Sequence, residues 1–128
     1  MKRRLALLAL LALLTLGFAS ARPNPDRLGI CYVFTAGKLS LRAPCVVSPG
    51  YGAGAQYVAL TIGTRQYDVE FPNLRPDQPP TIDGRAALSY RRDASFLEIL
   101  KGRPVEGEEY LDCVKTRDGK ADLCYTVL

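Results

Sequence analysis

The stretch QYVALTIGTRQYDVEF, residues 56–71, is the best local evidence for the fold of this chain. Large apolar residues recur at every second position on both sides of the Gly63-Thr64 pair, which is the pattern of strands with one buried face. A two-residue turn at this pair places apolar residues opposite each other on that face. The facing pairs are Val58 with Val69 and Leu60 with Tyr67. The stretch therefore predicts an antiparallel hairpin.

Short runs of the same kind, separated by glycine, proline and aspartate, fill the chain from residue 28 onward. Helical periodicity is absent after residue 21, although residues 96–101 could close as a helical turn. The expected turns lie at Ala36-Gly37-Lys38, Asp83-Gly84, Asp93-Ala94 (between strands at residues 85–92 and 95–100) and Asp118-Gly119. The sequence thus predicts an all-β fold, a small antiparallel sandwich or barrel of hairpins, and leaves the strand order open.

The first residues have the pattern of a cleaved export signal. Met1–Arg4 supplies a positive start, Leu5–Phe18 an apolar run, and Ala19-Ser20-Ala21 a cleavage site of small residues. A membrane-spanning helix needs roughly 20 apolar residues, so no stable membrane anchor is expected. We predict a signal peptide at residues 1–21 and an exported protein, periplasmic or secreted.

The remaining residues, 22–128, are predicted to form a single β domain. The proline-rich piece at residues 71–80 is interpreted as a rigid connection inside it, because neither flanking half could bury a core alone.

Four cysteines in an exported chain favour disulfides over metal or redox chemistry. Around a two-residue turn at Asp118-Gly119, the last two cysteines lie directly opposite each other, within the span of a disulfide. The first two centre on Lys38, as expected if that turn carries a bulge. Of the three formal pairings, we predict Cys31–Cys45 and Cys113–Cys124.

The charge balance argues against nucleic-acid binding. The chain has 17 basic and 13 acidic residues, but Lys2, Arg3 and Arg4 leave with the predicted signal, so 14 basic residues face 13 acidic ones. Nucleic-acid binding depends on many phosphate contacts, and so loses its main support. The one basic cluster, Arg91-Arg92, is interpreted as a solvated hairpin end.

The chain contains no histidine, which excludes Ser-His-Asp and Cys-His machinery and histidine-bearing zinc sites. We expect no enzyme activity, no cofactor and no metal. One catalytic alternative remains, because glycoside hydrolysis needs only two carboxylates. The available acidic residues, interpreted first as solvated strand faces and an acidic loop, are Asp68, Glu70, Glu98, Glu106, Glu108, Glu109 and Asp112.

The most unusual loop is residues 48–54, SPGYGAG. It lacks the Gly-Lys-Ser/Thr ending of a phosphate-binding loop. It is either a wide, flexible turn or a recognition loop, in which glycines let the backbone approach a partner and a tyrosine supplies an anchor. The candidate binding residues are Gly50, Tyr51, Gly52, Gly54 and Tyr57.

Two resemblances follow from these motifs. The runs at residues 29–33, 43–47, 82–86 and 90–93 resemble small exported bacterial β proteins of uncharacterised function, which implies export and cysteine-stapled hairpins. Residues 54–57 and 88–93 are similar to parts of periplasmic lysozyme inhibitors, disulfide-bearing β-barrels that insert a loop into the cleft of their target. An aromatic-rich strand of that family is missing here, and the cysteine spacing differs.

The sequence therefore predicts an exported non-catalytic binding or inhibitory module. Its partner would be an envelope or extracellular protein or a glycan. The alternatives are a structural accessory protein of the envelope without a discrete site, and a carboxylate-based glycan hydrolase.

Overall fold

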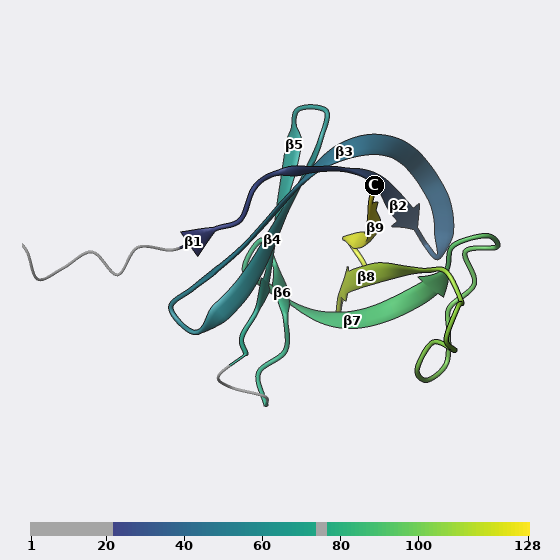
Figure 1. The fold of residues 1–128 in the computed structure, drawn as a ribbon. Helices are drawn as coiled ribbons and strands as arrows, with labels where there is room; N and C mark the ends of the chain where they lie inside the picture. The colour runs from purple at the N-terminus through teal and green to yellow at the C-terminus, as the bar shows by residue number, and fades with distance from the viewer. Residues whose placement is uncertain (1–21, 74–76) are drawn as a thin grey trace, which may run out of the picture.

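A computed structural model describes residues 22–73 and 77–128, which form an eight-stranded antiparallel barrel with a short ninth strand at its side (Figure 1). The strands are β1 (Arg22–Pro23), β2 (Arg27–Thr35), β3 (Lys38–Gly52), β4 (Ala55–Ile62), β5 (Arg65–Phe71), β6 (Thr81–Ile82), β7 (Arg85–Asp93), β8 (Tyr110–Thr116) and β9 (Asp122–Val127). Their order is β1-β3-β2-β9-β8-β7-β6-β5-β4, and pairing of β3 with β4 closes the barrel. The all-β prediction is confirmed, and the barrel is the form adopted. Among the described residues there is no helix long and apolar enough to cross a membrane.

The predicted signal peptide, residues 1–21, lies outside the described residues, as do residues 74–76 of the proline-rich connection.

The long strand β3 makes closure possible. Its first part pairs with β2 and its last part with β4, and Val46 and Val47 pair with both neighbours. At the opposite side, β6 contributes only two residues to the ladders with β5 and β7. The barrel is therefore firmly paired around β3 and loosely paired at β6, which leaves β5 and the second half of β7 apart at one end of the barrel.

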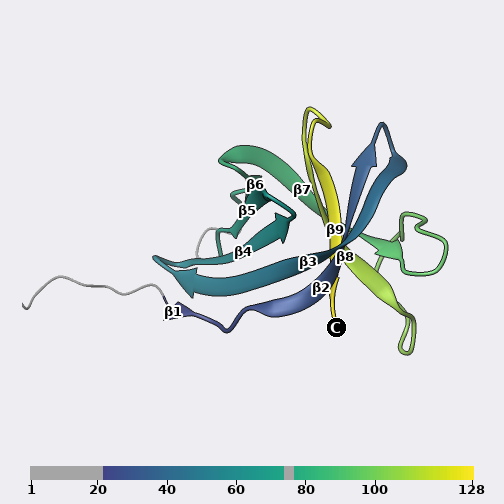
Figure 2. The same ribbon diagram turned by 90° about the horizontal axis from the view of Figure 1, so that it is seen from above.

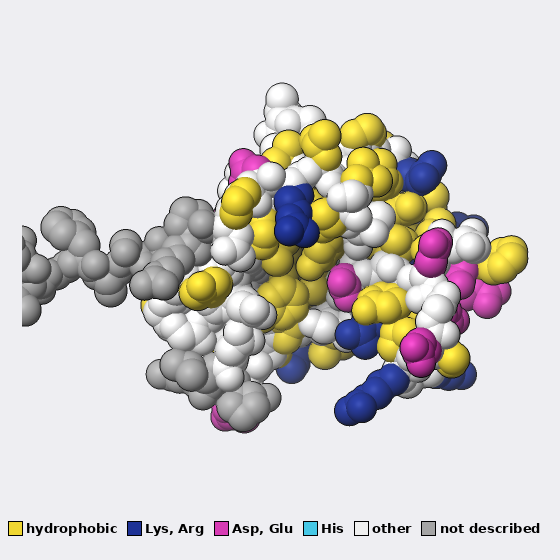
Figure 3. Space-filling model, in the orientation of Figure 1, with side chains coloured by type: hydrophobic (Ala, Val, Ile, Leu, Met, Phe, Trp, Pro, Cys, Tyr) yellow, Lys and Arg dark blue, Asp and Glu magenta, His cyan; other side chains and the backbone are white. Residues whose placement is uncertain are grey.

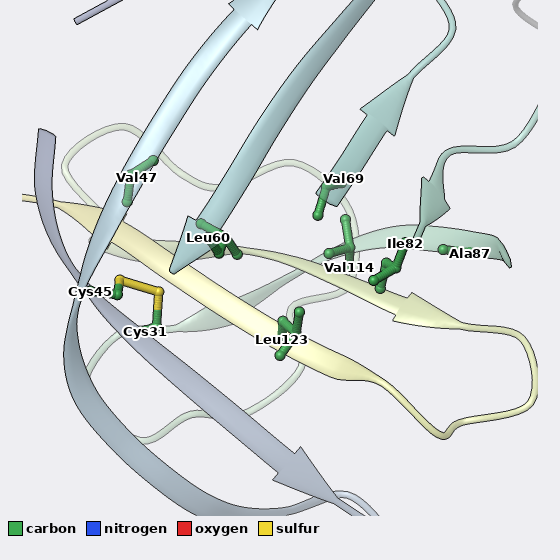
Figure 4. Close-up of a cluster of buried hydrophobic side chains, with 9 residues drawn as sticks. All are labelled: Cys31, Cys45, Val47, Leu60, Val69, Ile82, Ala87, Val114 and Leu123. Carbon is green, nitrogen blue, oxygen red and sulfur yellow. A yellow bond between two sulfur atoms is a disulfide. The ribbon is translucent and has the colours of Figure 1, made fainter. Parts of the chain in front are cut away.

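The barrel interior is filled with side chains. Every barrel strand contributes at least one buried hydrophobic residue, because alternate residues of each strand face inward. These residues are Cys31, Cys45, Val47, Leu60, Val69, Ile82, Ala87, Val114 and Leu123 (Figure 4).

A second core lies on the outer face of the sheet. Residues 94–109, which we call the flap, lie on the far side of β7, β8 and β9 from β4–β6 (Figure 2). Leu97 of the flap packs against buried side chains of β2, β8 and β9, namely Tyr32, Phe34, Leu111, Cys113 and Cys124. The predicted strand at residues 95–100 is wrong for most of its length. Residues 94–96 form a turn, and pairing with β7 is limited to the bridge from Arg92 to Ile99 and its flanking hydrogen bonds.

The hairpin at residues 56–71 has the predicted register, with Val58 opposite Val69 and Leu60 opposite Tyr67. Cys113 lies opposite Cys124, also as predicted. The connection between these cysteines is longer than a two-residue turn, since Thr116 N donates to Ala121 O across residues 117–120.

Both predicted disulfides are confirmed. Cys31 is paired in register with Ala43, so the Cys31–Cys45 disulfide runs diagonally between β2 and β3, with its Cα atoms 5.7 Å apart. A bulge at Val33/Phe34 sets this offset. Cys31–Cys45 lies inside the barrel and Cys113–Cys124 lies under the flap, so each of the two cores contains one disulfide.

Candidate functional site

The predicted loop at residues 48–54 is the end of a hairpin. Residues 48–52 belong to β3, and the turn is Ala53-Gly54, whose φ angles of 50° and 78° are those of a tight hairpin turn. The interpretation as a wide turn is therefore wrong for this segment. The ordered strand continues almost to the tip because β3 pairs with β4 as far as Gly52 and Ala55.

The two candidate tyrosines lie on different faces of this hairpin. Tyr51 shares the inward face of β3 with Val47, whereas Tyr57 lies on the outward face, opposite Gly50. The ring of Tyr57 covers Gly50 so closely that a Cβ at this position would overlap it. The glycine thus permits close approach, but the group that approaches is Tyr57 of the same chain.

A cavity of about 440 Å³ opens at this end of the barrel, and we call it the mouth. Phe71 of β5 and residues 89–91 of β7 line it, where these two strands are apart. Figure 3 shows a hollow with hydrophobic side chains at its floor and charged groups at its margin. Its lining includes Gly50, Tyr51 and Tyr57 from the candidate set; Gly52 and Tyr57 line a second hollow, and Gly54 is exposed at the hairpin turn.

Two rows of inward-facing side chains face each other across the mouth. In each row the members are direct register partners on adjacent strands. The first row is Tyr51, Gln56 and Phe71, and the second is Arg91, Asp112 and Tyr125. The mouth therefore combines aromatic rings with side chains that donate and accept hydrogen bonds.

The second row is electrically neutral as a unit. Arg91 Nε lies 3.6 Å from Asp112 Oδ1, and both side chains remain about half exposed. Burial, with a further contribution from the charge of Asp112, raises the pKa of Tyr125 to about 12. Tyr125 is thus a neutral phenol over the whole physiological range and can donate a hydrogen bond into the mouth.

Sequence reasoning missed most of the second row. Arg91 and Arg92 were interpreted together as a solvated hairpin end, but only Arg91 is exposed, and Arg92 is buried under the flap. That interpretation is therefore wrong for Arg92. Adjacent residues of a strand point to opposite faces of the sheet, so Arg91 and Arg92 could not both be exposed on the same face. The proximity of Arg91 to Asp112 and Tyr125, however, follows only from the pairing register of β7, β8 and β9.

A second hollow, of about 430 Å³, lies on the outer face of β4 and β5. Asp68 and Glu70 line it, next to the small residues Ala55 and Ala59. They are two of the carboxylates that the hydrolase alternative has available, and both are exposed. In the acidic loop, Glu108 accepts a hydrogen bond from Val105 N, which fixes part of that loop instead of leaving all of it solvated.

Comparison with known proteins adds no relative. A scan against protein-family models and searches of curated proteins and solved structures find no match to this chain.

Proposed function

We propose that this protein is an exported, non-catalytic binding protein that holds its ligand in the mouth of the barrel. The observation that carries the proposal is the mouth itself, with aromatic and polar side chains from opposite strands converging on one cavity. Sites of this volume, with an apolar floor and a few polar groups, are the usual form of small-ligand sites. Export is supported by the two disulfides, which persist in oxidising compartments.

The composition of the mouth favours binding over catalysis. Of the lining residues that the structure describes, Asp112 is the one carboxylate, and Arg91 is its ion-pair partner. A glycosidase needs two carboxylates with different environments. Asp68 and Glu70, two of the available carboxylates, are both exposed on the outer face of the sheet. They therefore lack the two different environments that such an enzyme uses.

An NMR experiment tests the proposal. The ¹⁵N-labelled, oxidised protein is titrated with a mixed fragment set containing aromatic, hydroxylated, cationic and anionic compounds. Binding fragments are expected to shift the amides of residues 50, 51, 89–91 and 112–114. The substitution Tyr51→Ala should weaken fragment binding. It should shift the melting temperature little, because Tyr51 is 47% exposed.

The matched control is Phe96→Ala, which removes an 81% exposed ring from the flap, outside the mouth. It should leave fragment binding unchanged. Fragments that bind elsewhere, or bind equally well to Tyr51→Ala, would contradict the proposal and favour the structural accessory role.

An inhibitory role has separate support in the β3–β4 hairpin, which extends from the side of the barrel (Figure 1). Its tip consists of small residues, Gly52–Ala55, so it could enter the cleft of a partner enzyme. Ala53→Arg would enlarge this tip. If the role is inhibition, as the similarity to lysozyme inhibitors implies, the wild-type protein should inhibit a lysozyme. The Ala53→Arg variant should lose that inhibition while its binding of fragments in the mouth stays intact.

A further inference from the structure

We infer that the ligand of the mouth is a neutral saccharide, held between the row of Tyr51, Gln56 and Phe71 and the row of Arg91, Asp112 and Tyr125. This inference rests on the proposed function and names the chemical class that the same site selects. It follows from the depth, the net charge and the hydrogen-bonding groups of the mouth.

The depth of the mouth excludes long apolar chains. Leu60, Val69 and Leu123 fill the barrel below it and are at most 1% exposed (Figure 4). An eight-stranded barrel has room either for its own side chains or for one small ligand. Because side chains occupy this interior, a ligand reaches only the mouth, and a lipid tail has no channel to enter.

The charge of the mouth disfavours ionic ligands. Arg91 and Asp112 are the charged side chains among the described lining residues, and they are 3.6 Å apart. A bound anion would gain from Arg91 but would be repelled by Asp112, and a bound cation would meet the reverse. A ligand without net charge is repelled by neither side chain, and it can bind without breaking the ion pair between Arg91 and Asp112.

The polar groups match vicinal hydroxyls. Since the Arg91–Asp112 contact joins Nε to Oδ1, the Nη groups can donate hydrogen bonds and Oδ2 can accept them. Gln56 adds an amide that both donates and accepts, and Tyr125 adds a neutral hydroxyl. Groups that donate beside groups that accept suit a ring of hydroxyls, each of which does both.

The aromatic groups match the other surface of a sugar. The faces of pyranose rings carry C–H groups, and these pack against aromatic rings, whose faces are electron-rich. Tyr51 and Phe71 lie at the two ends of the first row, with Gln56 between them. Tyr51 remains 47% exposed at the edge of the mouth, so the ligand can be one unit of a longer glycan.

The test is a titration of the oxidised, full-length protein with four probes. These are an uncharged N-acetylglucosamine tetramer, an uncharged glucose tetramer, a galacturonic acid tetramer and an uncharged tetrapeptide containing tyrosine. Amide shifts report where each probe binds. We expect at least one uncharged sugar to shift the amides of the mouth saturably, with the same affinity at low and high salt.

Two variants test whether substitutions in the mouth change binding affinity in the expected direction. Tyr51→Ala should weaken sugar binding by about tenfold, as loss of an aromatic anchor does. Asp112→Asn should weaken binding of the uncharged sugar, because it removes charge-assisted hydrogen bonds. It should strengthen binding of the galacturonic acid tetramer, because no carboxylate then opposes the attraction of Arg91 for the acid. Phe96→Ala should change neither affinity.

The failures are distinguishable. If the peptide or the acidic tetramer shifts the mouth of the wild-type protein and neither uncharged sugar does, the saccharide inference is overturned while the proposed function stands. If none of the probes and none of the fragments shifts the mouth of a folded protein, the binding function itself is overturned. Salt-sensitive sugar binding would also contradict the inference, because it would show that charge dominates recognition.

Discussion

The guanidinium of Arg92 lies 3.8 Å from the carboxylate of Asp122, and the two side chains are only 7% and 4% exposed. Tyr90 Oη donates a hydrogen bond to the same carboxylate, and Arg92 Nη1 donates one of 2.8 Å to the carbonyl of Leu97 in the flap. The guanidinium also lies over the ring of Phe34, 3.9 Å from its centroid. One buried cation therefore connects β7, β9, β2 and the flap.

Removing one partner of this pair should be strongly destabilising. Asp122→Ala leaves Arg92 buried without its counter-charge, and breaking a buried pair in this way typically costs about 3–5 kcal/mol. Arg65→Ala, which breaks the exposed pair with Asp83, should cost about 1 kcal/mol or less. Urea denaturation measures both variants. Equal losses would show that burial of the Arg92–Asp122 pair has no energetic consequence.

The flap should control reduction of one disulfide. Cys113–Cys124 lies under the flap, whereas Cys31–Cys45 lies in the barrel interior. Leu97→Ala removes a flap side chain that packs on the outer core, and we expect it to speed reduction of Cys113–Cys124 by about tenfold through easier local opening. Alkylation and peptide mass spectrometry after timed exposure to dithiothreitol measure each disulfide separately. Similar acceleration of Cys31–Cys45 would indicate global unfolding instead.

Gly50 should be intolerant of a methyl group because of one neighbour. In Gly50→Ala the new Cβ overlaps the ring of Tyr57, so the ring must move, at a typical overpacking cost of about 1–3 kcal/mol. Adding Tyr57→Ala should make Gly50→Ala nearly neutral, because the obstruction is gone. A double-mutant cycle by thermal denaturation measures this coupling. Additive effects would rule out the ring as the cause.

Stability should fall in strong alkali. Burial, and next the hydrogen bond to Asp122, raises the pKa of Tyr90 to about 12, and burial raises the pKa of Tyr125 to about 12 as well. Below the ordinary value of 10.0 both tyrosines are neutral in the folded and unfolded states, so pH has no effect through them. As pH rises from there toward 12, the unfolded chain ionises first, so folding loses free energy.

Two readouts check this pH dependence. Tyrosinate absorbance should show two late-titrating groups, one lost in Tyr90→Phe and the other in Tyr125→Phe. The denaturation midpoint of each variant should fall less steeply with pH than that of the wild-type protein, and Tyr51→Phe serves as the exposed control. If all tyrosines ionise together while the protein is folded, the burial argument fails for both residues.

Local pairing was the part of the fold that could be predicted. The register of residues 56–71 and the opposition of Cys113 and Cys124 depend only on where a turn centres, because residues equidistant from it must meet. Where the turn region is irregular, the same rule loses accuracy. The bulge at Val33/Phe34 displaces the partner of Cys31 to Ala43, although the disulfide still forms diagonally.

The candidate site could be predicted in part only. Tyr51 was singled out because glycines surround it, and that composition is visible in the chain. Arg91 and Asp112 carried no such signal, since their sequence neighbourhoods are those of ordinary polar strand ends. They meet only because β7 and β8, which the whole flap joins, pair in a register that places Arg91 opposite Asp112.

The β class, the hairpin at residues 56–71 and the disulfide pairs follow from local sequence, because alternation and turn chemistry act between near neighbours. Three other features become visible only in the folded barrel: β3 closes it against β4, Arg92 is buried while Arg91 faces the mouth, and two rows of side chains converge there. These outcomes depend on contacts between distant segments. Their free energy comes from burying two separate cores at once, which no local pattern encodes.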